Sequence, residues 1–203
     1  MVEYDRQNLG VGVWANTPLT NKVPGQSDPE VDPYAWYRWP ISEAVSLQPG
    51  ATVYLFPRAE PANGFYRATV EPNLAVNVTT HGVTFTPKIY YDVALRGPTY
   101  ELNAAYALPL KEIGSELDFY AAVGEYTWDA SVARSQPRTR ARGRYGSFTA
   151  TLPFQISARS KIVASIGYVA GWDATLRAGG GPRVSNALAA RRVVATLGYA
   201  VTF

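Results

Sequence analysis

The chain has 203 residues, a formal net charge of +3 at pH 7 and no cysteine, which excludes disulfides and thiolate metal sites. Charged residues make up only 17% of the chain and hydrophobic residues 47%, a low charge content for a water-soluble surface. No run approaches the roughly 18 consecutive apolar residues of a membrane-spanning helix, because the richest run, 162–172, is interrupted by Ser165, Gly167 and Gly171. The length suits one all-β domain over residues 1–203.

Alternation of apolar and polar residues with a period of two predicts strands along most of the chain. The predicted strands cover about 8–19, 30–41, 45–57, 65–79, 83–96, 99–110, 116–128, 143–154, 160–172 and 187–203. The clearest run is 66–78, with Tyr66, Val70 and Leu74 on one face and Arg67, Glu71 and Asn73 on the other. Such runs are longer than the roughly five or six residues usual in soluble sheets, and they match a tilted strand that crosses a bilayer.

The predicted links between strands alternate in length. Short links fall near 42–44, 80–82, 111–115 and 155–159, and longer ones at 20–29, 58–64, 129–142 and 173–186. Gly97-Pro98 is predicted as a tight turn on the long-loop side. Short turns on a periplasmic rim and long loops on an outer rim are typical of outer-membrane barrels. We therefore expect a closed up-and-down antiparallel transmembrane β-barrel of about ten strands, with eight or twelve as alternatives.

Two prolines, Pro72 and Pro87, lie inside predicted strands that must pair on both sides. Proline has no N–H to donate to a sheet ladder. We expect bulges or a local loss of pairing at both positions.

The last predicted strand ends on an aromatic residue, Phe203, with Val201, Tyr199 and Leu197 at alternate positions before it. This spacing resembles the signal read by the machinery that assembles barrels in the outer membrane of Gram-negative bacteria. It predicts that location and that partner for the chain. Met1 is followed by Val2-Glu3-Tyr4-Asp5 rather than by a basic and then an apolar segment, so Met1 is expected to stand in place of a removed signal peptide.

The segments 12–16, 54–57, 87–92 and 97–102 resemble the TorF-type porins, a family of uncharacterised bacterial outer-membrane proteins. The resemblance covers roughly residues 9–128. It implies passive, porin-like transport of small hydrophilic solutes and supplies no catalytic residue and no cofactor. In that family a further N-terminal hairpin often precedes the Gly-Val-Trp segment, which leaves open either a twelve-strand parent or a barrel complete at ten strands.

Which face of the sheet points inward is decided by size and charge. A soluble lipocalin-like barrel would hold its apolar face inside, but ten strands of bulky Tyr, Phe, Leu and Val side chains would overfill that interior. We therefore expect the polar face to line a lumen. The predicted lumen residues are Asp32, Arg38, Arg67, Glu71, Lys88, Asp92, Arg96, Glu101, Asp118, Lys161 and Arg192.

The predicted lumen has two interpretations. Its acids and bases can pair with one another and fill the interior together with Tyr34, Trp36, Tyr54, Tyr90 and Tyr120. This interpretation gives a mostly plugged barrel with a structural or surface-interaction role. Alternatively the same residues line a narrow polar channel. With a hairpin centre near residue 81, Asn73 is predicted opposite Lys88, with Lys88 and Asp92 diagonal to Glu71.

Five arginines cluster around the predicted loop at 130–144: Arg134, Arg138, Arg140, Arg142 and Arg144. The plain interpretation is a solvated loop. The sharper one is contact with lipopolysaccharide phosphates, since guanidinium groups match phosphate geometry. The cluster lacks interleaved aromatic residues, which argues against nucleic acid as a partner.

An outer-membrane hydrolase is the remaining alternative, and it finds little support. The single histidine, His81, lies in a predicted periplasmic turn beside Gly82. Barrel hydrolases act at the opposite rim, so we expect a turn residue and no enzyme. No phosphate-binding loop and no metal-ligand spacing occurs in the sequence, so no cofactor is expected.

Overall fold

The computed structural model describes residues 1–17, 29–59, 67–129, 140–174 and 191–201, and this part of the chain is nearly all β-structure. The strands are β1 (Val2–Arg6), β2 (Leu9–Asn16), β3 (Glu30–Tyr37), β4 (Trp39–Pro40), β5 (Val45–Leu55), β6 (Ala68–Thr80), β7 (Val83–Asp92), β8 (Gly97–Leu110), β9 (Ser115–Asp129), β10 (Arg140–Ser157), β11 (Ser160–Ala174) and β12 (Arg191–Val201). A 3₁₀ turn, η2 (Lys111–Ile113), joins β8 to β9. Over these ranges, no helix has the length and apolar character to span a membrane.

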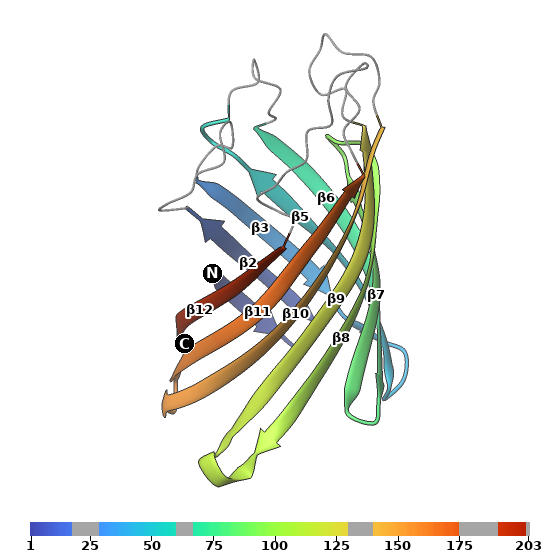
Figure 1. Cartoon of the computed structure of the whole chain (residues 1–203). Helices are drawn as coiled ribbons and strands as arrows, with labels where there is room; N and C mark the ends of the chain where they lie inside the picture. Colours follow the sequence, from blue (N-terminus) through green and yellow to red (C-terminus); the bar gives the residue numbers. More distant parts are fainter. Residues whose placement is uncertain (18–28, 60–66, 130–139, 175–190, 202–203) are drawn as a thin grey trace.

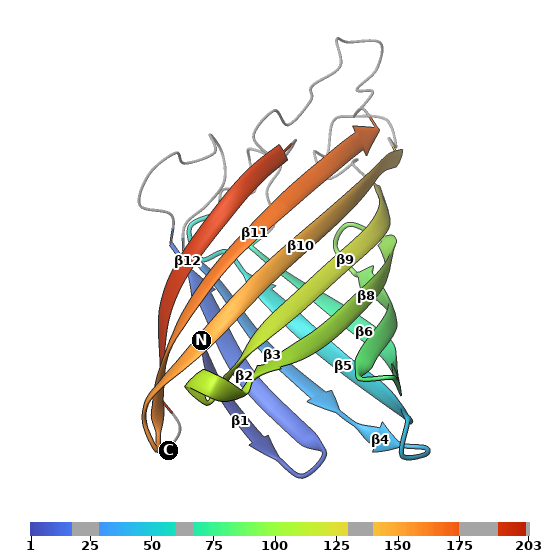
Figure 2. The ribbon, with the colours of Figure 1, turned by 60° about the horizontal axis from the view of Figure 1, so that its bottom comes forward.

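The strands form one antiparallel sheet in which chain neighbours pair, in the order β1-β2-β3-β5-β6-β7-β8-β9-β10-β11-β12. The two-residue strand β4 continues β3 and pairs with the same neighbour, β5. The sheet curls so far that its edge strands, β1 and β12, come to lie on the same side of the molecule (Figures 1 and 2). The predicted antiparallel up-and-down order is confirmed, while no pairing joins β1 to β12 in the described part of the chain.

The predicted count of about ten strands is corrected to twelve, the larger of the two alternatives. Each predicted segment corresponds to a strand, but residues 30–41 form two strands, β3 and β4, separated at Arg38. The other addition is β1, whose five residues pair with β2. Its Val-Glu-Tyr-Asp alternation was too short to be distinguished from an irregular terminus.

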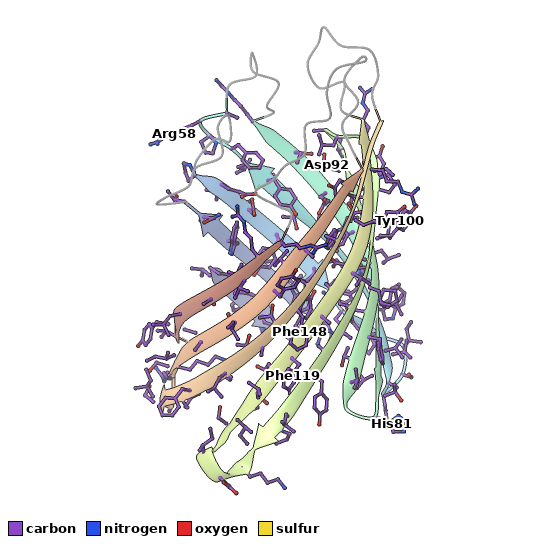
Figure 3. All side chains as sticks on the ribbon, viewed as in Figure 1. Arg58, His81, Asp92, Tyr100, Phe119 and Phe148 are labelled. Atoms are coloured by element: carbon purple, nitrogen blue, oxygen red, sulfur yellow. The ribbon has the colours of Figure 1, made fainter. Side chains whose placement is uncertain are left out.

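The apolar face of the sheet is exposed. Its outward positions include Val123, Ile166 and Leu197, whose side chains are 59%, 58% and 79% exposed. The buried hydrophobic residues of the described part are all alanines: Ala59, Ala75, Ala122 and Ala170. Tyr100 in Figure 3 points outward from this face. The side chains that would form the core of a soluble domain are therefore on the outside.

The accessible surface supports the same conclusion. It amounts to 14007 Å². A compact monomeric protein of this mass is expected to expose about 9,300 Å². A curled single-layer sheet explains the excess, because neither face is covered by a second layer of secondary structure.

The turn between β6 and β7 matches its prediction, and the turn between β7 and β8 differs from its prediction. His81 and Gly82 join β6 to β7 with φ of 50° and 78°, the left-handed backbone of a two-residue hairpin turn. At the other end of β7, the turn comprises residues 93–96 rather than Gly97-Pro98. Gly97 and Pro98 instead begin β8, where they pair with Asp92 and Tyr91.

The two strand prolines interrupt pairing without shifting the register. Between β6 and β7 the ladder skips Val76 opposite Pro87 and Asn77 opposite Thr86, and it resumes in the same register. Pro72 pairs with Ala51 of β5, but the ladder toward β7 stops at Asn73. The predicted local loss of pairing is thus confirmed on the β6–β7 side of both residues, since a proline has no N–H for the ladder.

Candidate functional site

The polar face of the sheet is its concave face. Tyr145 on β10 donates a hydrogen bond to Glu101 on β8, so its ring reaches across the whole width of β9. In the same way, Tyr34 on β3 donates across β2 to Glu3 on β1. Side chains that meet over an intervening strand belong to the inside of the curvature, so these contacts assign the polar face to the interior.

Glu101 is the centre of a polar cluster formed by three strands. Its carboxylate accepts hydrogen bonds from Tyr90 of β7, at 2.7 Å, and from Tyr145 of β10. Lys88 lies directly opposite Glu101 in the β7–β8 register. The Lys88 ammonium lies 4.4 Å from the centroid of the Tyr90 ring, a cation–π distance. This cluster balances the charge of Glu101 and holds two aromatic rings inward.

Glycines make room for these rings. A Cβ on Gly124 would lie 2.4 Å from the Tyr145 ring, and a Cβ on Gly143 would lie 2.2 Å from the Tyr126 ring. The β2–β3 pair shows the same arrangement, with Trp36 over Gly10 and Tyr34 over Gly12. Each ring lies over a glycine of the neighbouring strand, a position that a larger residue there would block.

A second group lies toward the end of the sheet where Figure 3 labels Asp92. Asp92 accepts hydrogen bonds from the Thr69 hydroxyl at 2.7 Å and from the Leu95 backbone N–H at 2.8 Å. The Tyr54 hydroxyl donates to Glu71 at 3.1 Å. Glu71 and Asp92 line a hollow of about 170 Å³.

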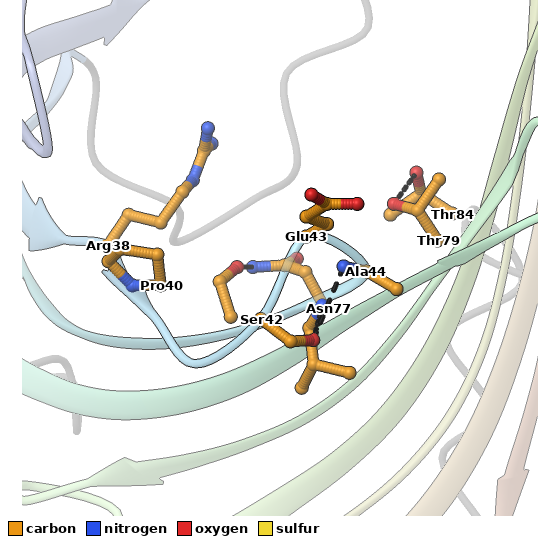
Figure 4. Close-up of a pocket in the computed structure, with 10 residues that line it drawn as sticks. Arg38, Pro40, Ser42, Glu43, Ala44, Asn77, Thr79 and Thr84 are labelled. Carbon is orange, nitrogen blue, oxygen red and sulfur yellow. Dashed lines mark hydrogen bonds between the residues drawn. The ribbon is translucent and has the colours of Figure 1, made fainter.

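The other end of the concave face holds a wider hollow of about 360 Å³, lined by residues that include Arg38, Glu43 and Asn77 (Figure 4). The Asn77 amide donates to Ser46 at 3.2 Å and to Gln48 at 3.3 Å, and its carbonyl accepts from Thr86 at 2.9 Å. This end is lined mainly by neutral hydroxyl and amide groups that hydrogen-bond to one another.

The structure places the residues predicted for a lumen as follows. All of these residues except Arg96 lie in a strand or next to the end of one. The strand register assigns each of them to the concave face. Arg96 is corrected to a turn residue with φ of 51°. Glu3 and Tyr145 belong to the same face and were missed. Glu3 lies in the unrecognised first strand, whereas the alternation could have identified Tyr145.

The predicted register of the β6–β7 hairpin is wrong by two residues. Lys88 lies opposite Ala75 rather than Asn73. The turn consists of His81 and Gly82 alone, so the hairpin is centred between them. In the separate β7–β8 register Lys88 lies opposite Glu101, and Glu71 receives its hydrogen bond from Tyr54 of β5.

The predicted arginine loop divides into two parts. Arg134 and Arg138 lie outside the described residues. Arg140 and Arg142 belong to β10 and are corrected from the predicted link 129–142 to strand, and Arg144 lies in β10 within the predicted strand 143–154. Arg142 and Arg144 form ion pairs with Glu125 of β9, with N–O distances of 2.5 and 2.8 Å. These two guanidiniums are more than half exposed, so the pairs contribute little to stability and remain accessible to solvent.

The C-terminal apolar residues and His81 lie where the sequence predicts them. Leu197, Tyr199 and Val201 share the outward face of β12, and Phe203 lies outside the described residues. His81 lies in the turn labelled at the lower end of Figure 3, where its Nδ1 is 3.0 Å from the Thr80 hydroxyl. In the described ranges, no three His, Cys, Asp or Glu side chains come together as metal ligands.

Comparison with protein-family models, curated proteins and solved structures gives no significant match for this chain.

Proposed function

We propose that the chain is a transmembrane β-barrel of the bacterial outer membrane that passes small hydrophilic solutes through its interior. The observation that carries the proposal is the division of one curled sheet into an exposed apolar face and a concave polar face. Lipid is the environment in which large outward hydrophobic side chains are favourable, and a polar interior is typical of such barrels. We also propose that the chain is related to the TorF-type porins, on the sequence segments that resemble them.

A membrane location requires the sheet to close. Each unpaired backbone N–H or C=O in hydrocarbon costs several kcal/mol, so open sheet edges are not stable there. The path from β1 to β12 contains an odd number of antiparallel strands, because β4 lies off it. The two edges therefore run in the same direction. Closure between them would form a parallel seam, with β1 covering less than half of β12 because it has 5 residues against 11.

The interior chemistry favours slow, passive transport over catalysis. Most inward groups with described contacts are carboxylates, phenols, hydroxyls and amides that hydrogen-bond to one another, and the cations Arg38 and Lys88 lie over aromatic rings. Such a wall presents polar groups to a hydrated solute and needs no cofactor. Aromatic rings held inward, as around Glu101, narrow the path and limit the size of the solute.

Planar bilayer recordings test this function. The folded protein should give discrete single-channel currents, and Tyr90→Ala should raise their conductance because it removes a ring from the concave face. Tyr91→Ala is the matched control, since Tyr91 is the next residue on the same strand and is 45% exposed on the outer face. Silence of the wild type and of both variants would refute conduction and favour the plugged, structural barrel.

A further inference from the structure

Charged residues on the outer face of β2–β12 gather at one end of the sheet. Among the described strand residues, the alternation assigns six of them to this face: Glu125, Asp129, Arg140, Arg142, Arg144 and Arg191. All six lie toward the upper end of β9, β10 and β12 in Figure 2, away from the turn at 158–159 that joins β10 to β11. Arg140 lies opposite Asp129 in the register, so these two residues add no net charge.

The other three arginines outnumber the carboxylate beside them. Glu125 pairs with one Nη of Arg142 and with the Nε of Arg144. The remaining N–H groups of these two guanidiniums have no ion-pair partner in the described ranges, and the side chains are 54% and 64% exposed. Arg191 is exposed as well and forms no ion pair within the same ranges. Three cations against one anion leave a positive surface, here called the basic patch: Arg142, Arg144 and Arg191.

The members of the basic patch lie close enough together to contact one large headgroup. Gly146, Ala170 and Arg191 lie side by side across β10, β11 and β12. Arg144 is two residues further along β10 than Gly146. With strands about 4.8 Å apart and a rise of about 3.3 Å per residue, the Cα atoms of Arg144 and Arg191 are about 12 Å apart. Two long side chains at that separation reach the same anionic group from opposite sides.

The level of the basic patch fits the headgroups of a bilayer. Arg144 lies six residues along β10 from Ala150, the partner of Ile166 in the middle of β11. With about 3.3 Å per residue and a strand tilt of about 40°, Arg144 is raised by about 15 Å above the level of Ile166. The apolar band of such barrels is about 25 Å tall, so a band centred on Ile166 ends below Arg144. Arg191 lies lower, opposite Ala170, and its long side chain can extend toward the headgroups.

We propose that Arg142, Arg144 and Arg191 bind the phosphate groups of an anionic membrane lipid, for which the lipid A part of lipopolysaccharide is the reference. Guanidinium groups match the geometry of phosphate oxygens, and Glu125 holds two of them side by side. Tyr100, opposite Glu125 and 57% exposed, supplies an aromatic ring at the same level, as is typical of the membrane interface. The site rests on the membrane location in the proposed function and is independent of conduction.

Native mass spectrometry of detergent-folded protein with added lipid A tests the site. Arg144→Gln and Arg191→Gln should each weaken lipid A binding by about fivefold, the contribution expected of one basic residue at an anionic lipid surface. Arg192→Gln is the matched control, because Arg192 is the next residue of β12, opposite Val169 on the concave face, and its loss removes the same charge. Equal binding by all variants and the wild type, or an equal loss in the control, would overturn the proposal.

The wild type alone tests the chemistry of the ligand. It should bind lipid A more tightly than dephosphorylated lipid A, and inorganic phosphate at the same concentration should not displace the lipid. Equal binding of the two lipids, or displacement by inorganic phosphate, would overturn a lipid phosphate site. Gel mobility of unboiled samples verifies that the variants are folded. A folded, detergent-dependent protein that does not bind lipid A refutes the site while the barrel stands, whereas a protein soluble in plain buffer refutes both.

Discussion

Replacing Ile166 by Arg is expected to destabilise the folded protein in lipid by about 2–4 kcal/mol, the cost of an arginine on the lipid face near the bilayer midplane. Ile166 lies in the middle of β11 on the outer face and is 58% exposed. In a soluble protein, an arginine at so exposed a position would be nearly neutral. The size of the effect therefore distinguishes lipid from water as the environment of this face.

Ser165→Arg provides the matched control, because Ser165 is the preceding residue of the same strand. It hydrogen-bonds to Thr196 on the concave face. Its guanidinium would extend into the polar interior, so the loss of stability should be clearly smaller. Urea unfolding of protein refolded into lipid vesicles measures both values. Equal costs for the two substitutions, or a neutral Ile166→Arg, would refute the lipid-facing assignment.

Gly124→Val is expected to destabilise the protein by about 1–3 kcal/mol, as overpacking of a close contact does. The new side chain would occupy the position of the Tyr145 ring, 2.4 Å from the ideal Cβ. The ring would have to leave Glu101, its hydrogen-bond acceptor.

The double variant Gly124→Val, Tyr145→Ala isolates that cause. Once the ring is gone, the added valine should cost far less, so the two changes should be strongly non-additive. Both are measured by the same urea unfolding. Additive losses would mean that Gly124 is required for its backbone rather than for the space it leaves.

The sheet and its two faces could be predicted from the sequence because side-chain alternation is a local property of each strand. The long alternating segments, such as β6 and β8, were placed within a few residues. The short strand β1 was missed, since five residues carry too little pattern for assignment. The start of β10 was also placed too late, because Arg142 looks like a loop residue until its ion-pair partner Glu125 on the neighbouring strand is known.

The candidate site was less predictable than the fold. Its polar residues could be identified from alternation, but their partners depend on register, and an error of two residues at the His81-Gly82 turn joined Lys88 to the wrong carboxylate. The approach of Tyr145 to Glu101 spans 44 residues of sequence and requires a glycine on the strand between them. No local pattern in the sequence indicates such a contact between distant residues.

The measurement that tests the membrane barrel most directly is the electrophoretic mobility of detergent-refolded protein with and without boiling. Barrels closed by backbone hydrogen bonds resist SDS until they are heated. We predict that the unboiled protein migrates differently from the boiled protein, and that it stays in solution only in detergent or lipid. Identical migration of the two samples, together with solubility in plain buffer, would contradict the account.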